Sequence, residues 1–351
     1  MSELRHDPLE DRWILVAPDR ARRPRFHPGV PVVPLDPGVC PFCPGNESQT
    51  RPAIAVVDLG DDGPRFRRIS EEVSDWWVRV VPNQYPMLQV ERELTRTGSG
   101  LQQGQTGVGA HEVVIETPRH DADLADLDDD ALGAVIETWR ERIRDLYRDR
   151  RLVQAQVFRN HGALAGASVP HPHSQLTAMC IEPPRQLRHR LCMQDEYRRH
   201  GHRLLDRQWE EARTEGSRVL IDRDGVGVFA PWASPNRYEF VVLMPSAAPE
   251  FTGLVRDEAR ALASVLRELL DRMRRALGDP PTNLGLFVEP NHEALGTPVE
   301  GFRWHLRVVP RLSPMAGFEW MGEVPVNSTL PEDAVTHLSL ASLEDDPGAE
   351  A

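Results

Sequence analysis

A short run of histidines in the sequence could attack phosphorus. Residues 169–175 read Val-Pro-His-Pro-His-Ser-Gln, and if this run is a β-strand, alternate side chains point to one face. His171, His173 and Gln175 would then lie together. A neutral imidazole can form a covalent phosphoramidate with a phosphorus centre, and water or an alcohol can later break it. Gln175 can donate to a phosphoryl oxygen without repelling it. The alternative is two ordinary surface histidines beside a proline.

The segment before this run is rich in glycine and alanine. It begins at Asn160 and includes Gly162 and Gly166. Because glycine lacks a Cβ atom, backbone N–H groups near it can approach phosphate oxygens closely. The pattern favours a phosphate-binding loop in front of the histidines.

The cysteines form one close pair, Cys40 and Cys43, and two isolated residues, Cys180 and Cys192. Two thiolates at this spacing can bind one tetrahedral metal ion, with two further ligands from elsewhere in the chain. A redox pair or two inert thiols are the alternatives. Cys180 and Cys192 have no partner in the sequence pattern, and we interpret them as incidental thiols.

Composition excludes several classes of partner. The 351 residues carry 41 Lys plus Arg against 54 Asp plus Glu, a net charge of -13. Nucleic acids and anionic membrane surfaces attract proteins with excess positive charge, so neither is expected as a partner. No apolar run approaches the roughly 20 residues that span a bilayer, and the N-terminus has no hydrophobic signal core. We therefore expect a cytoplasmic protein.

Apolar periodicity predicts two long amphipathic helices, one following residues 128–130 and one over 262–273. Residues 185–213 predict a charged helical stretch, and 95–109 a mobile loop. Alternating or continuous apolar runs predict β-strands, which lie at 76–81, 111–116, 153–158, 226–230, 240–244, 284–288 and 304–309.

These elements occur in the same order twice: strand, strand, long helix, strand, strand. A Pro-Asn-X-Tyr turn appears in both halves, at residues 82–85 and 235–238. The order predicts a duplicated α+β unit with antiparallel sheets and helices packed on one side. We expect halves at 1–190 and 191–340, and a disordered acidic tail at 341–351.

The motifs resemble those of the galactose-1-phosphate uridylyltransferases, which belong to the histidine-triad superfamily. That family has the signature His-Pro-His-X-Gln after a loop that begins with Asn. It also has Trp-Ile-Leu-Val and a Pro-X-Arg-Ala-X-Arg-Pro run near the N-terminus, here at 13–16 and 18–24. Matching motifs extend from about residue 8 to residue 311. The resemblance implies two histidine-triad-like halves.

The resemblance also implies the roles of particular residues. The zinc ligands would be Cys40, Cys43, His120 and His171, in a structural site without an open position. His111 is a competing ligand on sequence alone. The contacts to nucleotide, phosphate or sugar would come from Arg20, Asn83, Asn160, Gly166 and Ser168.

The sequence departs from the family pattern near the C-terminus. Some members hold a second metal with a glutamate and three histidines, and His305 matches one of these ligands. Arg307 stands where another histidine would be, and His189 where the glutamate would be. Because an arginine disfavours a neighbouring divalent cation, we expect this second metal site to be absent and Arg307 to bind substrate phosphate instead.

The activity that the resemblance implies is a two-step transfer. His173 would take the uridylyl group from UDP-glucose, and a hexose 1-phosphate, such as galactose 1-phosphate, would then accept it. An ADP-sugar or dinucleoside polyphosphate phosphorylase would use the same histidine, and a water acceptor would make the protein a hydrolase. A non-catalytic zinc-bound nucleotide sensor would form no covalent adduct. The resemblance further implies a homodimer in which Arg20 could act across the interface.

Overall fold

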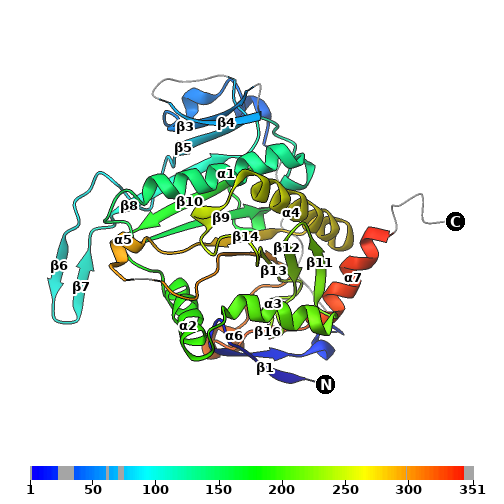
Figure 1. The fold of residues 1–351 in the computed structure, drawn as a ribbon. Coiled ribbons are helices and arrows are strands. Elements are labelled where there is room, and N and C mark those ends of the chain that lie inside the picture. The colour runs from blue at the N-terminus through cyan, green and yellow to red at the C-terminus, as the bar shows by residue number, and fades with distance from the viewer. Residues whose placement is uncertain (1, 23–34, 61–62, 70–74, 298, 344–351) are drawn as a thin grey trace.

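The chain folds around one long β-sheet with helices on both faces (Figure 1). This computed structural model describes residues 2–22, 35–60, 63–69, 75–297 and 299–343. The class is α+β, as predicted. In the described part of the chain, no helix combines the length and the apolar character needed to cross a bilayer.

The long sheet has 11 strands in the order β11-β12-β13-β15-β14-β9-β10-β8-β5-β3-β4. Every neighbouring pair in it is antiparallel. The strands are β3 (Ala55–Gly60), β4 (Gly63–Arg68), β5 (Val78–Pro82), β8 (Gly109–Ile115), β9 (Gln154–His161), β10 (His173–Met179), β11 (Val219–Arg223), β12 (Val226–Phe229), β13 (Phe240–Leu243), β14 (Thr282–Phe287) and β15 (His305–Pro310).

The duplicated unit is visible in the strand order. The first half contributes β5-β8-β10-β9 and the second contributes β12-β13-β15-β14. The halves join where β9 pairs with β14, at partners such as Phe158 and Gly285. The strands of both halves therefore form one continuous sheet rather than two.

The two long helices predicted from periodicity pack together on one face of this sheet. They are α1 (Asp129–Leu146) and α4 (Arg256–Leu277) (Figure 1). Asp128 caps α1 by accepting a hydrogen bond from the Ala131 amide (2.7 Å). The apolar positions that predicted α1 are buried: Leu132, Val135, Ile136, Trp139, Ile143 and Leu146.

The charged stretch predicted at 185–213 is two helices, α2 (Pro184–His200) and α3 (Leu204–Glu215). Gly201, with φ of +73°, ends α2 in the left-handed conformation, which stops the helix. Both helices lie on the face opposite α1 and α4. Trp209 of α3 packs on Gly227 of β12, and His189 of α2 stacks on Phe287 of β14.

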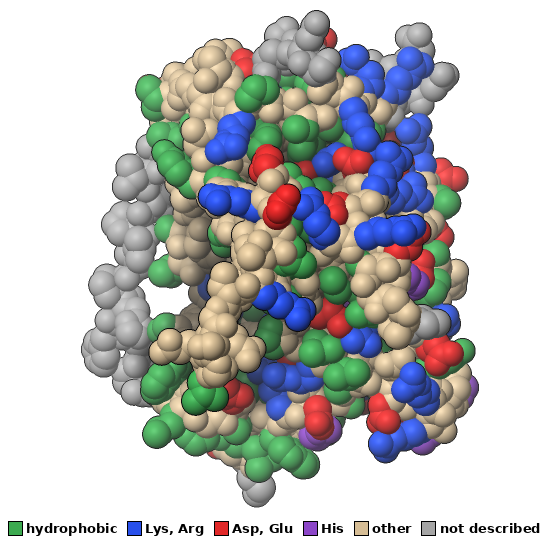
Figure 2. Space-filling view, turned by 90° about the vertical axis from the view of Figure 1, so that its left-hand side faces the viewer, with side chains coloured by type: hydrophobic (Ala, Val, Ile, Leu, Met, Phe, Trp, Pro, Cys, Tyr) green, Lys and Arg blue, Asp and Glu red, His purple; other side chains and the backbone are tan. Residues whose placement is uncertain are grey.

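Two smaller sheets flank the long one. The first joins β1 (Glu3–Asp7), β2 (Arg12–Val16) and β16 (Val326–Asn327). The second is a hairpin of β6 (Arg96–Ser99) and β7 (Gln102–Gln105), which corrects the predicted loop at 95–109. Its residues are exposed, and it projects from the body of the molecule. Cationic and acidic side chains are interspersed over the face from which it projects (Figure 2).

The remaining helices are short or peripheral: α5 (His292–Leu295), α6 (Gly317–Gly322) and α7 (Pro331–Leu343). Because α7 extends to Leu343, the first three residues of the predicted acidic tail are helical. The rest of that tail, 344–351, lies outside the described residues.

Candidate active site and metal centre

His173 and Gln175 stand on β10, between β8 and β9 in the middle of the first half. Alternate side chains of a strand point to opposite faces. Ser174, between them, is buried toward α1, and its hydroxyl accepts a hydrogen bond from Trp139 Nε1 (2.8 Å). His173 and Gln175 therefore share the face that points away from α1.

The imidazole of His173 is held in one tautomer. Its Nδ1 lies 2.8 Å from the backbone oxygen of His171. Because a carbonyl oxygen only accepts, Nδ1 carries the proton and Nε2 keeps its lone pair. Burial lowers the pKa of His173, and the positive charge of Arg159 lowers it further. At neutral pH the ring is therefore neutral, with a free nucleophilic nitrogen.

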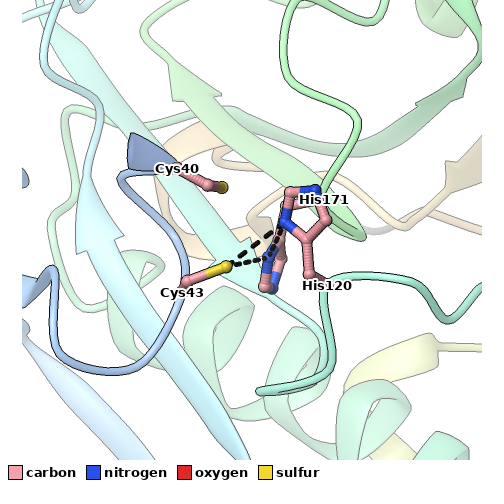
Figure 3. A group of neighbouring side chains, drawn as sticks. All are labelled: Cys40, Cys43, His120 and His171. Atoms are coloured by element: carbon pink, nitrogen blue, oxygen red, sulfur yellow. Dashed lines mark hydrogen bonds between the residues drawn. The ribbon is translucent and has the colours of Figure 1, made fainter. Parts of the chain in front are cut away.

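The four predicted metal ligands come together beside this ring (Figure 3). One donor atom from each of Cys40, Cys43, His120 and His171 lies within 4.8 Å of the others. Cys43 Sγ is 3.2 Å from His120 Nδ1 and 3.5 Å from His171 Nδ1, and the two nitrogens are 3.4 Å apart. The residues come from three segments far apart in sequence, and the group can bind a metal ion.

Hydrogen bonding orients His171 so that one ring nitrogen can bind a cation. His171 Nε2 donates to the backbone oxygen of Thr117 (2.8 Å), so its Nδ1 lone pair faces the group. Burial lowers the pKa of His171 to about 4, which keeps the ring neutral. Burial and the nearby Cys40 raise the pKa of Cys43 to about 12, an effect that a divalent cation opposes by favouring the thiolate. Two sulfurs and two nitrogens are a donor set that tetrahedral structural zinc sites use.

Phe42 contacts both His171 of the metal group and His173. It lies between the two cysteines in sequence, and its ring centroid is 5.1 Å from that of His173, edge to face. The same ring is 6.1 Å from that of His171. The loop that carries Cys40 and Cys43 therefore also packs against His173. Sequence analysis missed Phe42, whose only signal is its place inside the Cys-X-X-Cys motif.

His111 lies on β8 and is not one of the four residues of the metal group. Its Nε2 is 2.8 Å from Gln175 Oε1 and 3.2 Å from Asn83 Nδ2, and its Nδ1 is 3.2 Å from the Met87 amide nitrogen. Asn83 directly follows β5, two strands away from Gln175. His111 thus joins two of the residues predicted to act on the nucleotide.

The glycine- and alanine-rich loop follows β9. Asn160 is the second-last residue of that strand, and Gly166 adopts a left-handed φ of +94° that glycine allows without strain. Asn283 of β14 donates both to Asn160 Oδ1 and to the backbone oxygen of Ala165, each at 2.8 Å. Gly166 and Ser168 are exposed. A residue of the second half, which sequence analysis missed, therefore holds the loop in shape.

Arg20 lies apart from these residues. It is exposed in the 3₁₀ helix Pro18–Arg22, which follows β2 of the small sheet. The contact between Arg20 and a nucleotide therefore stays a prediction.

Arg307 is buried in a cluster of charged side chains instead of beside His173. Its Nη1 is 3.2 Å from Glu10 Oε1, and its Nε is 3.3 Å from Glu239 Oε1. His189 Nε2 also lies 2.9 Å from Glu10 Oε1, and the His189 and His305 rings stack at 5.6 Å. The contacts of Arg307 are those of a buried ion pair, and the prediction that it binds phosphate stays untested.

The substitution Arg307→Met separates these two roles. It should destabilise the fold by about 3–5 kcal/mol, because Glu10 and Glu239 would stay buried without their cation. Urea unfolding measures this loss. Arg148→Met is the control, since that side chain is 75% exposed and should cost little. Unchanged stability with a weaker affinity for substrate phosphate would support the phosphate-binding prediction instead.

A second group that could hold a metal consists of Asp123, His161 and Asp279. His161 Nδ1 is 3.6 Å from Asp123, and its Nε2 is 3.1 Å from Asp279. The hydrogen bond to Asp279 and the charge of Asp123 raise the pKa of His161. Both carboxylates favour the protonated imidazole, so these three residues can pair with one another as an ion triad.

Comparison with known proteins places this arrangement in a family. The profile of the galactose-1-phosphate uridyl transferase N-terminal domain matches residues 64–183. ADP-glucose phosphorylase of Arabidopsis thaliana is 30% identical over 346 residues, covering 97% of this chain and 93% of that protein. The chain belongs to the galactose-1-phosphate uridylyltransferase family. A galactose-1-phosphate uridylyltransferase of Saccharomyces cerevisiae is 25% identical over 352 residues, covering 92% of this chain and 90% of that protein.

Solved structures agree with this family membership. The crystal structure of the Arabidopsis thaliana ADP-glucose phosphorylase with bound ADP-glucose has a TM-score of 0.79 and 27% identity, covering 97% of this chain and 98% of that one. Membership shows an enzyme of the nucleotidyl-transfer kind. It leaves open which nucleotide sugar this member of the uridylyltransferase family uses, because its relatives include both a uridylyltransferase and an ADP-glucose phosphorylase.

Proposed function

We propose that this protein transfers a nucleoside monophosphate from a nucleotide sugar to a phosphate-bearing acceptor through a covalent bond to His173. The observation that carries the proposal is the tautomer of His173. Its Nδ1–H is bonded to the His171 carbonyl, so Nε2 presents a lone pair from a buried, neutral ring. A ring that only bound nucleotide would have no need of this arrangement.

The chemistry balances in two steps. In the first, Nε2 attacks the α-phosphorus, the Nε2–P bond forms, and the bond from the α-phosphorus to the bridging oxygen breaks, releasing the sugar 1-phosphate. The positive charge that develops on the ring is stabilised by the Nδ1–H bond to the His171 carbonyl. In the second, a phosphate oxygen of the acceptor attacks phosphorus and the Nε2–P bond breaks. An amide N–H from Gln175 stabilises the charge on the non-bridging oxygens in both steps.

We propose that the metal group holds a structural Zn²⁺. Four protein ligands, three of them buried and His120 half-buried, leave no open coordination position for a substrate. When bound, the ion would fix the cysteine loop, with Phe42, against the nucleophile. Two thiolate ligands suit a reducing compartment, which supports the predicted cytoplasmic location.

Two pairs of substrates are candidates. UDP-glucose with galactose 1-phosphate is the pair expected from the motifs, and the matching family profile and the uridylyltransferase relatives support it. ADP-glucose with inorganic phosphate is the second, supported by the higher identity and the TM-score of 0.79 to an ADP-glucose phosphorylase. Both pairs use the same covalent step at His173.

Intact-mass measurement of the covalent adduct tests the proposal. The protein is incubated with UDP-glucose or with ADP-glucose, each without acceptor. A uridylyl increment supports the transferase and an adenylyl increment supports the phosphorylase. Addition of galactose 1-phosphate or inorganic phosphate should then discharge the adduct and identify the acceptor. No increment from either donor, with zinc bound and the fold intact, would reject the covalent mechanism and favour a nucleotide sensor.

We also propose that the chain forms a homodimer. Four large apolar side chains are more than half exposed. Trp13 lies on β2, and Phe318, Trp320 and Met321 lie on α6. Contiguous exposed apolar residues commonly mark a protein interface. Analytical ultracentrifugation tests this, and Trp320→Asp should shift a dimer toward monomer, whereas a monomeric wild type would contradict the proposal.

A further inference from the structure

We propose that His111 is a positioning residue that orients Gln175, so that Gln175 presents its amide N–H group to a phosphoryl oxygen. The inference rests on the proposed function, because it names what holds a donor of the same site. His111 itself touches neither the metal group nor His173 in the contacts described above.

The position of His111 follows from the sheet register. It lies on β8 and is paired with Thr177 of β10, whereas Gln175 is paired with Val113. His111 and Gln175 are therefore diagonal neighbours on adjacent antiparallel strands. Their side chains share one face, within reach of each other. Only 7% of His111 is exposed, so the surrounding residues, and not water, decide how its ring is bonded.

A backbone group fixes the tautomer of His111. The Met87 N–H can only donate, and it points at Nδ1 from 3.2 Å. Nδ1 must therefore be the unprotonated, accepting nitrogen, and Nε2 must carry the proton. The opposite tautomer would place two N–H groups against each other. This assignment uses no choice of amide orientation, because a backbone nitrogen cannot be exchanged with an oxygen.

The tautomer in turn fixes Gln175. A protonated Nε2 at 2.8 Å requires an acceptor, so the atom of Gln175 facing His111 is the carbonyl oxygen. The Gln175 amide nitrogen is then directed away from His111. In the described part of the chain this nitrogen has no hydrogen-bond acceptor. It is available to an oxygen of the substrate.

The orientation of the Asn83 side-chain amide is fixed by Tyr85. Its Oδ1 accepts from the Tyr85 N–H (2.8 Å), so its amide nitrogen is the atom near His111. That nitrogen is a donor, as is His111 Nε2, so their 3.2 Å contact is not a hydrogen bond. The Asn83 amide is therefore set by the Tyr85 N–H, and only the Gln175 amide depends on His111 for its orientation.

A double-mutant cycle with Gln175 tests this role. His111→Leu removes the donor at similar volume, and His111→Gln keeps a donor near the position of Nε2. We expect His111→Leu to slow adduct formation about 10- to 100-fold with little change in the donor concentration giving half-maximal rate. His111→Gln should recover most of that rate. In a Gln175→Ala background, His111→Leu should have much less further effect, because its target is gone.

The outcomes separate the inference from the proposed function. If the wild type forms no adduct with either nucleotide sugar, the proposed function fails. If the wild type forms the adduct and His111→Leu reacts at the wild-type rate, or slows the reaction equally with and without Gln175, the positioning role is overturned.

The tautomer can be checked without any activity. In ¹⁵N NMR of the resting protein, with the His111→Gln variant used to assign the signal, His111 should show an unprotonated Nδ1 and a protonated Nε2. The reverse pattern would overturn the inference even for a fully active enzyme.

Discussion

Replacing His173 by alanine is expected to abolish both the covalent adduct and turnover, and to leave the protein folded and able to bind metal. The side chain supplies the only atom of the protein that bonds to phosphorus in the proposed mechanism. Loss of a nucleophile of this kind lowers kcat by about 10⁴-fold or more. Intact mass reports the adduct, and steady-state kinetics with the donor identified above report turnover.

The structure explains why this effect should be catalytic. His173 contributes to a polar site and contacts one edge of Phe42, and the four metal ligands do not include it. The free energy of unfolding should therefore change by less than about 2 kcal/mol. His202→Ala, at an exposed position between α2 and α3, is the matched control and should keep full activity. A His173→Ala variant that still forms an adduct would place the nucleophile elsewhere.

Removal of the metal should produce the second largest effect. Cys43→Ser replaces one of the two thiolates by a weak ligand, and a strong chelator removes the ion from the wild type. A structural zinc site adds its binding free energy to the stability of the fold. We expect a loss of at least about 4 kcal/mol, equivalent to roughly 5 °C in Tm for a chain of this length. Thermal unfolding with metal analysis measures both.

Activity should fall together with the metal, because the cysteine loop carries Phe42 against His173 and because His171, a proposed metal ligand, also accepts the Nδ1–H of His173 at its backbone oxygen. Cys180→Ser and Cys192→Ser should change neither metal content nor Tm, since both thiols lie outside the group. One metal ion per chain in the wild type and none in Cys43→Ser is the expected stoichiometry. Full stability of the metal-free protein would reject a structural role.

The sequence determined the local elements and the chemistry of the nucleophile. Apolar periodicity located α1 and α4, and the repeated order of elements anticipated the matching strand orders of the two halves. The cysteine pair and the family resemblance named four ligands that lie together in the fold. These features depend on residue type and short spacing, which a linear sequence records directly.

The sequence pattern predicted less well the features that have no buried face or that depend on contacts between distant elements. The exposed hairpin at 96–105 has no buried face and hence no alternating apolar signal, and the break between α2 and α3 rests on a single glycine conformation. The joining of both halves into one sheet depends on the pairing of β9 with β14. Strand partners more than a hundred residues apart leave no trace in periodicity.

Only the tertiary structure shows which side chains His111, Phe42 and Arg307 meet. On sequence alone, His111 could compete as a metal ligand by residue type, although its neighbours matched a strand, and Arg307 was predicted to bind phosphate. The register of β8 against β10 places His111 beside Gln175, and the packing of Glu10 and Glu239 around β15 surrounds Arg307 with carboxylates. Residue type sets what a side chain can do, whereas its neighbours in the fold determine which hydrogen bonds and charges it meets.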